Sequence, residues 1–144
     1  MDLKNRSAFH EYAIEDRLTA GMVLKGTEVK SIREGKVSFT DAYCFFHQGE
    51  LWIKGLHIAL YRLGTAANHE AVHDRKLLLT KRELRKWEQK TKEKGYTVVP
   101  LRIFFNEKNL AKIEIGLGKG KKLHDKRATI RDRDVARDLQ RYKG

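Results

Sequence analysis

Cysteine and long apolar runs are the features that this 144-residue sequence most clearly lacks. Its one cysteine, Cys44, excludes an intramolecular disulfide and fits a reducing compartment. Because Cys44 lies in an apolar, strand-like run, we interpret it as a core residue and not as a catalytic thiol. No run approaches the roughly 20 apolar residues of a membrane-spanning helix, and the polar opening segment has no signal-peptide character. We therefore expect a cytoplasmic protein without a membrane-spanning segment.

Acidic residues are also few relative to basic ones. The chain has 31 lysines and arginines against 19 aspartates and glutamates, which gives a formal net charge of +12 and a pI near 9.9. This excess favours an anionic partner, most often a nucleic acid. A membrane surface is the weaker option, because the sequence has no basic amphipathic helix with a broad apolar face.

Half of the net charge is concentrated at the C-terminal end. From Lys119 to Gly144 ten lysines and arginines stand against four aspartates, a net charge of +6 within 26 residues. Such a block must stay solvated or meet an anion, because burying unpaired charge is costly. Its apolar residues form only a thin line. We expect residues 1–122 to form the folded domain, and residues 123–144 to be a basic tail that is mobile when free and orders on RNA.

Most of the folded domain has the apolar pattern of β-strands. Strands are predicted over residues 12–24, on both sides of a turn within 39–58, and in a long hairpin over 99–117. Gly21 marks a bulge or bend in the first of them. Pro100 would cost a ladder hydrogen bond, so its strand is at an edge there or starts there.

Together these segments favour a mainly β fold with short helices. No alternation of strands and long helices suggests a parallel sheet. We predict a single-domain OB-like antiparallel β-barrel, closed so that no strand edge stays exposed.

A first short helix is predicted from Thr27, which can cap it, to Gly35, which can end it. The helical spacing places Lys30 and Arg33 on one face. This face is either a phosphate contact or a solvated surface, and the spacing alone favours neither.

The second helix has the clearest boundaries in the sequence. Thr80 and Glu83 form a capping box, and the helix ends before Gly95. Leu84 and Trp87 provide a narrow apolar stripe, so we expect the helix to cover the outside of the core.

Between these helices, residues 61–76 form an aperiodic loop that contains His69-Glu70-Ala71-Val72-His73. The spacing matches the H-E-x-x-H pattern of zinc peptidases, in which two histidines and a third ligand hold the metal and the glutamate is the general base. Here the helix would be short and uncapped. A zinc hydrolase using His69, Glu70 and His73 is therefore a minor alternative, and a polar loop is the main interpretation.

Four blocks of residues resemble the SmpB family, whose members partner transfer-messenger RNA in bacterial ribosome rescue. In chain order they are Asn5-Arg6 with His10, Gly26 to Ser31 followed by Arg33, Arg75 to Leu79, and Gly120-Lys121-Lys122 with Asp125-Lys126-Arg127. The sequence departs from the family at Thr19, where the family usually has Glu, so no role is carried over to this side chain.

The resemblance implies a non-enzymatic RNA-binding adaptor without a cofactor. Its barrel would grip the elbow of the tRNA-like domain, and its tail would be helical on the ribosome, in the decoding centre and mRNA channel of a stalled small subunit. The implied tRNA-like-domain residues are Asn5, His10, Glu28, Lys30, Arg33, Arg75, Lys76, Lys119, Lys121 and Lys122. The implied ribosome-facing residues are His124, Asp125, Lys126, Arg127, Arg131 and Arg133.

The implied partners are transfer-messenger RNA and the ribosome, and indirectly elongation factor Tu and alanyl-tRNA synthetase; we expect a monomer. Lysine and arginine bind phosphate without reading sequence, which suits a partner recognised by its shape. Glu28 either accepts a hydrogen bond from RNA or only orients Lys30 or Arg33. The charge pattern alone would also permit a generic ribosomal or rRNA-binding barrel.

Overall fold

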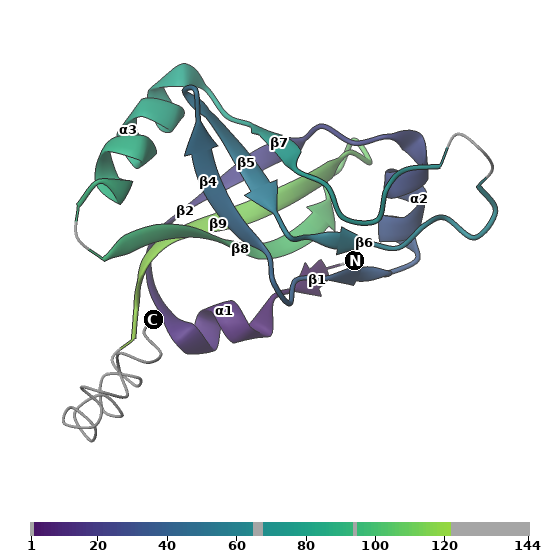
Figure 1. Ribbon diagram of the computed structural model, residues 1–144, viewed down its shortest axis with the longest axis horizontal. Coiled ribbons are helices and arrows are strands. Elements are labelled where there is room, and N and C mark those ends of the chain that lie inside the picture. Colours follow the sequence, from purple (N-terminus) through teal and green to yellow (C-terminus); the bar gives the residue numbers. More distant parts are fainter. Residues whose placement is uncertain (1, 65–67, 94, 122–144) are drawn as a thin grey trace.

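The computed structural model describes residues 2–64, 68–93 and 95–121, so Lys122 and the predicted tail lie outside the described residues (Figure 1). The elements in chain order are β1 (Asp2–Lys4), α1 (Arg6–Glu11), β2 (Tyr12–Met22), α2 (Gly26–Arg33), β3 (Val37–Ser38), β4 (Tyr43–His47), β5 (Glu50–Lys54), β6 (His57–Ile58), β7 (Arg75–Leu78), α3 (Lys81–Thr91), β8 (Tyr96–Phe105) and β9 (Ala111–Gly120). The mainly β prediction is confirmed.

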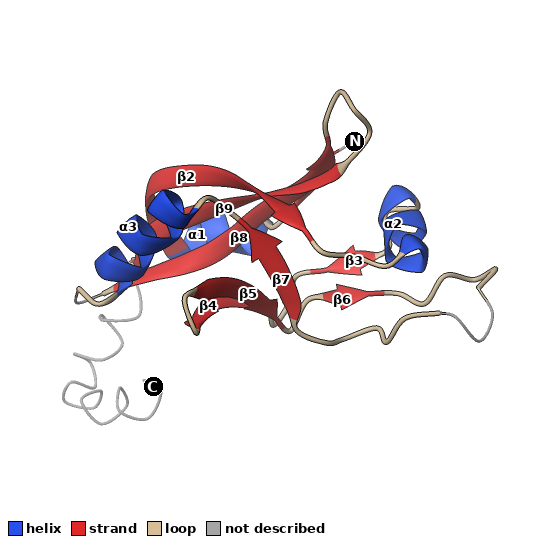
Figure 2. Ribbon diagram, turned by 90° about the horizontal axis from the view of Figure 1, so that it is seen from above, coloured by secondary structure: helices blue, strands red, loops and turns tan. Residues whose placement is uncertain are grey.

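Seven strands form one antiparallel sheet in the order β1-β8-β9-β2-β7-β5-β4. The sheet curls until β4 lies beside β8 (Figures 1 and 2), but no ladder closes the ring within the described residues. The expectation of full closure is therefore wrong, although the OB-like curvature is present. The edge strands of the sheet are β1, which pairs with β8, and β4, and the small β3–β6 pair lies near α2.

The core fills the interior of the curled sheet. Alternate residues of the long β8–β9 hairpin point inward, and Ile103, Ile113 and Ile115 are fully buried. Trp87 of α3 and Ile32 of α2 close the two ends of this cluster. A second cluster forms on the outer face of the sheet under α1, and it contains Ala8, Val99 and Leu101. Apolar burial of this kind is the main force that stabilises the fold.

The helix α3, the second helix predicted from the sequence, starts as predicted. The backbone N–H of Thr80 donates to Glu83 Oε1 at 2.9 Å, and the N–H of Glu83 donates back to Thr80 Oγ1 at 3.1 Å. Leu84 and Trp87 are buried, which confirms the apolar stripe. Gly95 follows with φ of +87° and turns the chain into β8.

Two local predictions are wrong. The bulge in β2 lies between Ile14 and Asp16, and Gly21 pairs regularly with Leu78 and Lys112. Thr27 does not cap α2. The backbone N–H of Lys25, which precedes the helix, donates to Glu28 Oε1 at 2.8 Å, and the Thr27 hydroxyl bonds His69 instead.

Pro100 is placed as predicted. The strand β1 pairs with β8 only over residues 102–104, so β8 is an edge strand at Pro100.

Candidate nucleic-acid interface

The predicted RNA-binding residues that remain exposed form two separate groups. We call His10, Lys119 and Lys121 the Lys119 group; they lie where α1 meets the end of β9. We call Lys30 and Arg33 the α2 group; they lie on the outer face of α2. Figures 1 and 2 both place α2 at one end of the molecule and α1 with α3 toward the other. The sequence predicted one surface, whereas the structure has two groups of basic residues.

The Lys119 group is held by backbone and by an aromatic ring. The N–H of Lys121 donates to the carbonyl of Glu11 at 2.9 Å, and its ammonium donates to the carbonyl of Phe9 at 3.1 Å. The ammonium of Lys119 lies 4.7 Å from the centre of the Tyr96 ring. These contacts fix the end of β9 against α1, while the side chains of Lys119 and Lys121 stay exposed.

A second lysine also lies over the Tyr96 ring at this end of the molecule. Lys90 Nζ lies 4.8 Å from the ring centre, and the Tyr96 hydroxyl donates to Glu15 at 2.7 Å. The hydrogen bond to this carboxylate, followed by burial and by the charges of Glu15 and Glu93, raises the pKa of Tyr96. Sequence reasoning missed Tyr96, because nothing local links it to lysines 6 residues before and 23 residues after it.

The α2 group is held by side chains from other elements. Arg33 stacks on Phe105 with 4.1 Å between the guanidinium carbon and the ring centre, and it donates to the side chain and carbonyl of Asn109 at 3.2 and 3.3 Å. Lys30 Nζ lies 5.5 Å from the centre of the Tyr61 ring. The loop between β6 and β7, which carries Tyr61, therefore helps to define this surface.

Glu28 is not on the surface. Its side chain is fully buried, and Oε2 accepts from Arg75 Nε and from His73 Nε2, both at 2.7 Å. Burial alone would raise the pKa of Glu28, but the Lys25 N–H and the Arg75 and His73 side chains more than offset it and hold the pKa below the ordinary 4.5. The direct partners of Glu28 are therefore Arg75 and His73, and the buried carboxylate touches neither Lys30 nor Arg33, so it acts on these two residues only through the position of α2.

Arg75 is equally buried, with 1% of its surface exposed. Beyond Glu28, its guanidinium donates to the carbonyls of Leu56 at 2.7 Å and Ala71 at 3.0 Å. One buried ion pair thus joins α2, β7 and the β6–β7 loop. A direct RNA contact by the Arg75 side chain, as predicted, does not agree with this burial. The alternation of Arg75 with the buried Leu77 in a strand was the signal that could have shown it.

Asn5 is a third predicted contact that the structure buries. Its side-chain amide donates to the carbonyl of Pro100 at 2.8 Å, and its backbone N–H donates to the carbonyl of Leu101 at 2.8 Å. Asn5 therefore fastens the entry of α1 to β8. Lys76, in contrast, is partly exposed, and its ammonium lies 3.7 Å from Glu50.

The H-E-x-x-H segment does not form a zinc-peptidase site. Residues 68–74 are not helical, and Val72 bridges to β6 instead. His69 is 3% exposed; its Nε2 donates to the carbonyl of Ile58 at 2.9 Å, and its Nδ1 bonds the Thr27 hydroxyl at 2.9 Å. With His73 bonded to Glu28, both histidines join the loop to α2. Among residues 2–64, 68–93 and 95–121, no group of three metal-binding side chains is present.

Comparison with known protein families matches residues 2–144 to the family described as SmpB protein. The chain belongs to the SmpB family. Among its SmpB relatives, the SsrA-binding proteins of Phocaeicola vulgatus and Bacteroides thetaiotaomicron are 52% and 51% identical over 141 residues, which cover 98% of this chain and 94% of each relative. The SsrA-binding protein of Geobacter sulfurreducens is 49% identical and covers 94% of this chain and 88% of its own length.

A solved SmpB structure gives the same result for the fold. The structure reported as "tmRNA-SmpB: a journey to the center of the bacterial ribosome" superposes with a TM-score of 0.71 at 50% identity, and the match covers 85% of each chain. The relatives are named for binding and not for catalysis. None of the described helices has the length and apolar character needed to span a membrane.

Thr19, the departure from the SmpB pattern, is exposed on β2 and lies directly opposite Glu114 of β9. Opposite residues of an antiparallel pair share one face of the sheet. The position therefore belongs to the outer face of the sheet, next to a carboxylate.

Proposed function

We propose that this chain is an RNA-binding adaptor that binds the tRNA-like domain of transfer-messenger RNA and delivers it to stalled ribosomes for trans-translation. The observation that carries the proposal is membership of the SmpB family at about 50% identity over nearly the whole chain. The names of the relatives state binding to SsrA, and the solved structure pairs SmpB with tmRNA and the ribosome.

In this proposal the two exposed groups contact different parts of the folded RNA. Lysine and arginine side chains contact phosphates without reading sequence, which suits a partner known by its shape. The α2 group and Lys76 serve one part of the tRNA-like domain, and the Lys119 group with Lys122 serves another. Glu28 and Arg75 act indirectly, because they hold α2 against the β6–β7 loop and so fix Lys30 and Arg33.

The tail supplies the ribosomal half of the function. We assign His124, Asp125, Lys126, Arg127, Arg131 and Arg133 to the decoding centre and mRNA channel, where the tail orders as a helix; these residues lie outside the described part of the chain. Elongation factor Tu and alanyl-tRNA synthetase are then indirect partners that act on the bound RNA, and the chain works as a monomer.

The direct test is the identity of the RNA that copurifies with the native protein. We expect transfer-messenger RNA in stoichiometric amount. Recovery of rRNA alone would favour a generic rRNA-binding barrel and would contradict the proposal. Recovery of no RNA at low salt would contradict any RNA-binding role.

A truncation separates the two halves of the proposal. A chain that ends at Lys122 should bind the isolated tRNA-like domain almost as tightly as the full chain, yet tagging on stalled ribosomes should be lost. If truncation instead removes binding to the isolated RNA, the assignment of the tail to the ribosome is wrong.

A further inference from the structure

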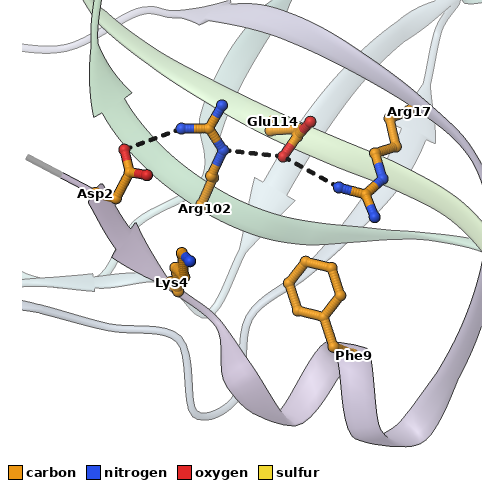
Figure 3. A pocket seen from close by; sticks show the side chains of 6 residues that line it. All are labelled: Asp2, Lys4, Phe9, Arg17, Arg102 and Glu114. Atoms are coloured by element: carbon orange, nitrogen blue, oxygen red, sulfur yellow. Dashed lines mark hydrogen bonds and ion pairs between the residues drawn. The ribbon is translucent and has the colours of Figure 1, made fainter.

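A hollow of about 370 Å³ lies beside α1 on the outer face of the sheet (Figure 3). None of the RNA-binding residues predicted from the sequence lines it. Its lining residues come from β1, α1, β2, β8 and β9: Asp2, Lys4, Phe9, Arg17, Arg102 and Glu114. It is therefore distinct from both the Lys119 group and the α2 group.

The floor of the hollow is set by strand register. Lys4 lies opposite Arg102, Arg102 opposite Glu114, and Glu114 opposite Thr19, across four neighbouring strands. Directly opposite residues point to one face, so these four side chains form a single polar row.

Arg102 is held rigidly in this row. Its Nε donates to Glu114 at 3.0 Å and its Nη1 donates to Asp2 at 2.9 Å (Figure 3). Its guanidinium carbon lies 4.1 Å from the centre of the Phe104 ring. One face of the guanidinium is thus backed by an aromatic ring, and two carboxylates fix the group from opposite sides (Figure 3).

Arg17 is placed at the other side of the same carboxylate. Its Nη1 lies 3.8 Å from Glu114, and its guanidinium carbon lies 5.4 Å from the centre of the Phe9 ring. Figure 3 shows Phe9 reaching from α1 toward Arg17. The hollow therefore lies between two guanidinium groups, each of which is close to an aromatic ring.

The pairs made by Arg17 and Asp2 add little stability, because these two side chains are 52% and 45% exposed, and only the Arg102–Glu114 pair is more deeply placed. What the row does achieve is the orientation of flat, cationic planes toward an open hollow. Unpaired RNA bases stack on arginine planes and aromatic rings, while carboxylates accept hydrogen bonds from base amino groups and 2′-hydroxyls. Among the described residues no carboxylate lies within 4 Å of the Lys4 ammonium, which leaves it available for a phosphate.

We propose that this hollow binds one unpaired nucleotide of the RNA partner, with its base against the Arg102 and Arg17 planes and its phosphate near Lys4. The size of the hollow is at the lower end for small-molecule sites and suits a single nucleotide. Three cations face two carboxylates, so the lining keeps one net positive charge and is less suited to a run of duplex phosphates. This inference rests on the proposed RNA-binding function and names a third contact for it.

The test is a titration of the full chain with AMP, CMP, GMP and UMP. The NMR chemical shifts of the arginine side chains and of the backbone are measured at each nucleotide concentration. We expect a saturable shift confined to residues around Phe9, Arg17 and Arg102. Arg102→Gln should weaken this binding about tenfold or more, because a stacking contact is lost. Arg82→Gln on α3, an exposed arginine with the same charge change, is the matched control and should have no effect.

A second variant distinguishes loss of nucleotide binding from loss of folding. Arg102→Lys keeps the charge but removes the flat plane, so it should retain the backbone spectrum and lose nucleotide binding. A shift produced equally by inorganic phosphate would show an anion site only and would overturn the assignment of the base.

Failure of the nucleotide-binding inference can be distinguished from failure of the proposed function. If the tRNA-like domain binds with normal affinity while no mononucleotide shifts these residues, and Arg102→Gln leaves RNA protection unchanged, the hollow is not an RNA site and the proposed function stands. If the tRNA-like domain itself does not bind, the proposed function fails first.

Discussion

The two ends of this protein hold their exposed cations in different ways. At the α2 end, Lys30 and Arg33 depend on an internal ion pair, because Glu28 and Arg75 tie their helix to the β6–β7 loop. At the α1 end, Lys119 and Lys121 depend on backbone hydrogen bonds and on the Tyr96 ring. Similar surface charges thus rest on a buried charge at one end and on none at the other.

The difference predicts that interior substitutions will act on one end at a time. Removing one partner of a buried ion pair leaves an uncompensated charge, which is far more costly than losing an exposed pair. The α2 end should therefore be sensitive to changes that never touch RNA, and the α1 end should respond mainly to changes of the cations themselves.

The largest effect is expected for Arg75→Met. It leaves Glu28 buried without its main partner and removes the donors to the carbonyls of Leu56 and Ala71, of which Ala71 keeps the N–H of Ile58. The free energy of unfolding should therefore fall by about 3–5 kcal/mol in urea denaturation. Lys76→Met is the matched control, because its exposed pair with Glu50 should be worth less than about 1 kcal/mol. Equal losses for the two variants would contradict the comparison.

The dependence of stability on pH sharpens the same point. Because the folded pKa of Glu28 lies below its ordinary value of 4.5, its contribution is present above that value and is lost as the pH falls through the folded pKa. The wild-type protein should therefore lose more stability on acidification below about pH 4.5 than the double variant Glu28→Gln/Arg75→Met. Parallel pH profiles from urea denaturation would show that this carboxylate contributes nothing.

A smaller effect is expected for Asn5→Ala at the α1 end. The substitution removes the hydrogen bond to Pro100 and should lower the free energy of unfolding by about 1 kcal/mol. RNA affinity, measured well below the unfolding temperature, should stay within about twofold, since the Asn5 side chain is buried. A tenfold loss of affinity without a loss of stability would restore Asn5 as an RNA contact.

The sequence predicted the local elements well where local chemistry decides them. The capping box at Thr80 and the apolar stripe of Leu84 and Trp87 depend on neighbours three or four residues apart, and both are present. Closure of the barrel was wrong, because it depends on how far a twisted sheet curls, which no local pattern records.

The candidate site was predicted less completely, for a similar reason. Glu28 and Arg75 looked like surface charges, because the partner that allows their burial is 47 residues away. The polar row of Arg102 and Glu114 needs strand register, which joins residues from both ends of the chain. Glu28 and Arg75 both carried a local signal of burial, since Glu28 lies one helical turn from the buried Ile32 and Arg75 alternates in its strand with the buried Leu77.

The central claim, that two separate cationic groups hold one folded RNA, is tested most directly by the salt dependence of binding to the tRNA-like domain. Affinity should fall steeply with salt for the wild type. Both Lys119→Ala/Lys121→Ala and Lys30→Ala/Arg33→Ala should flatten the slope of log K against log salt by roughly 1–2, whereas Arg82→Ala/Lys86→Ala on α3 should not. A salt-independent affinity, or a slope unchanged by either pair, would contradict the account.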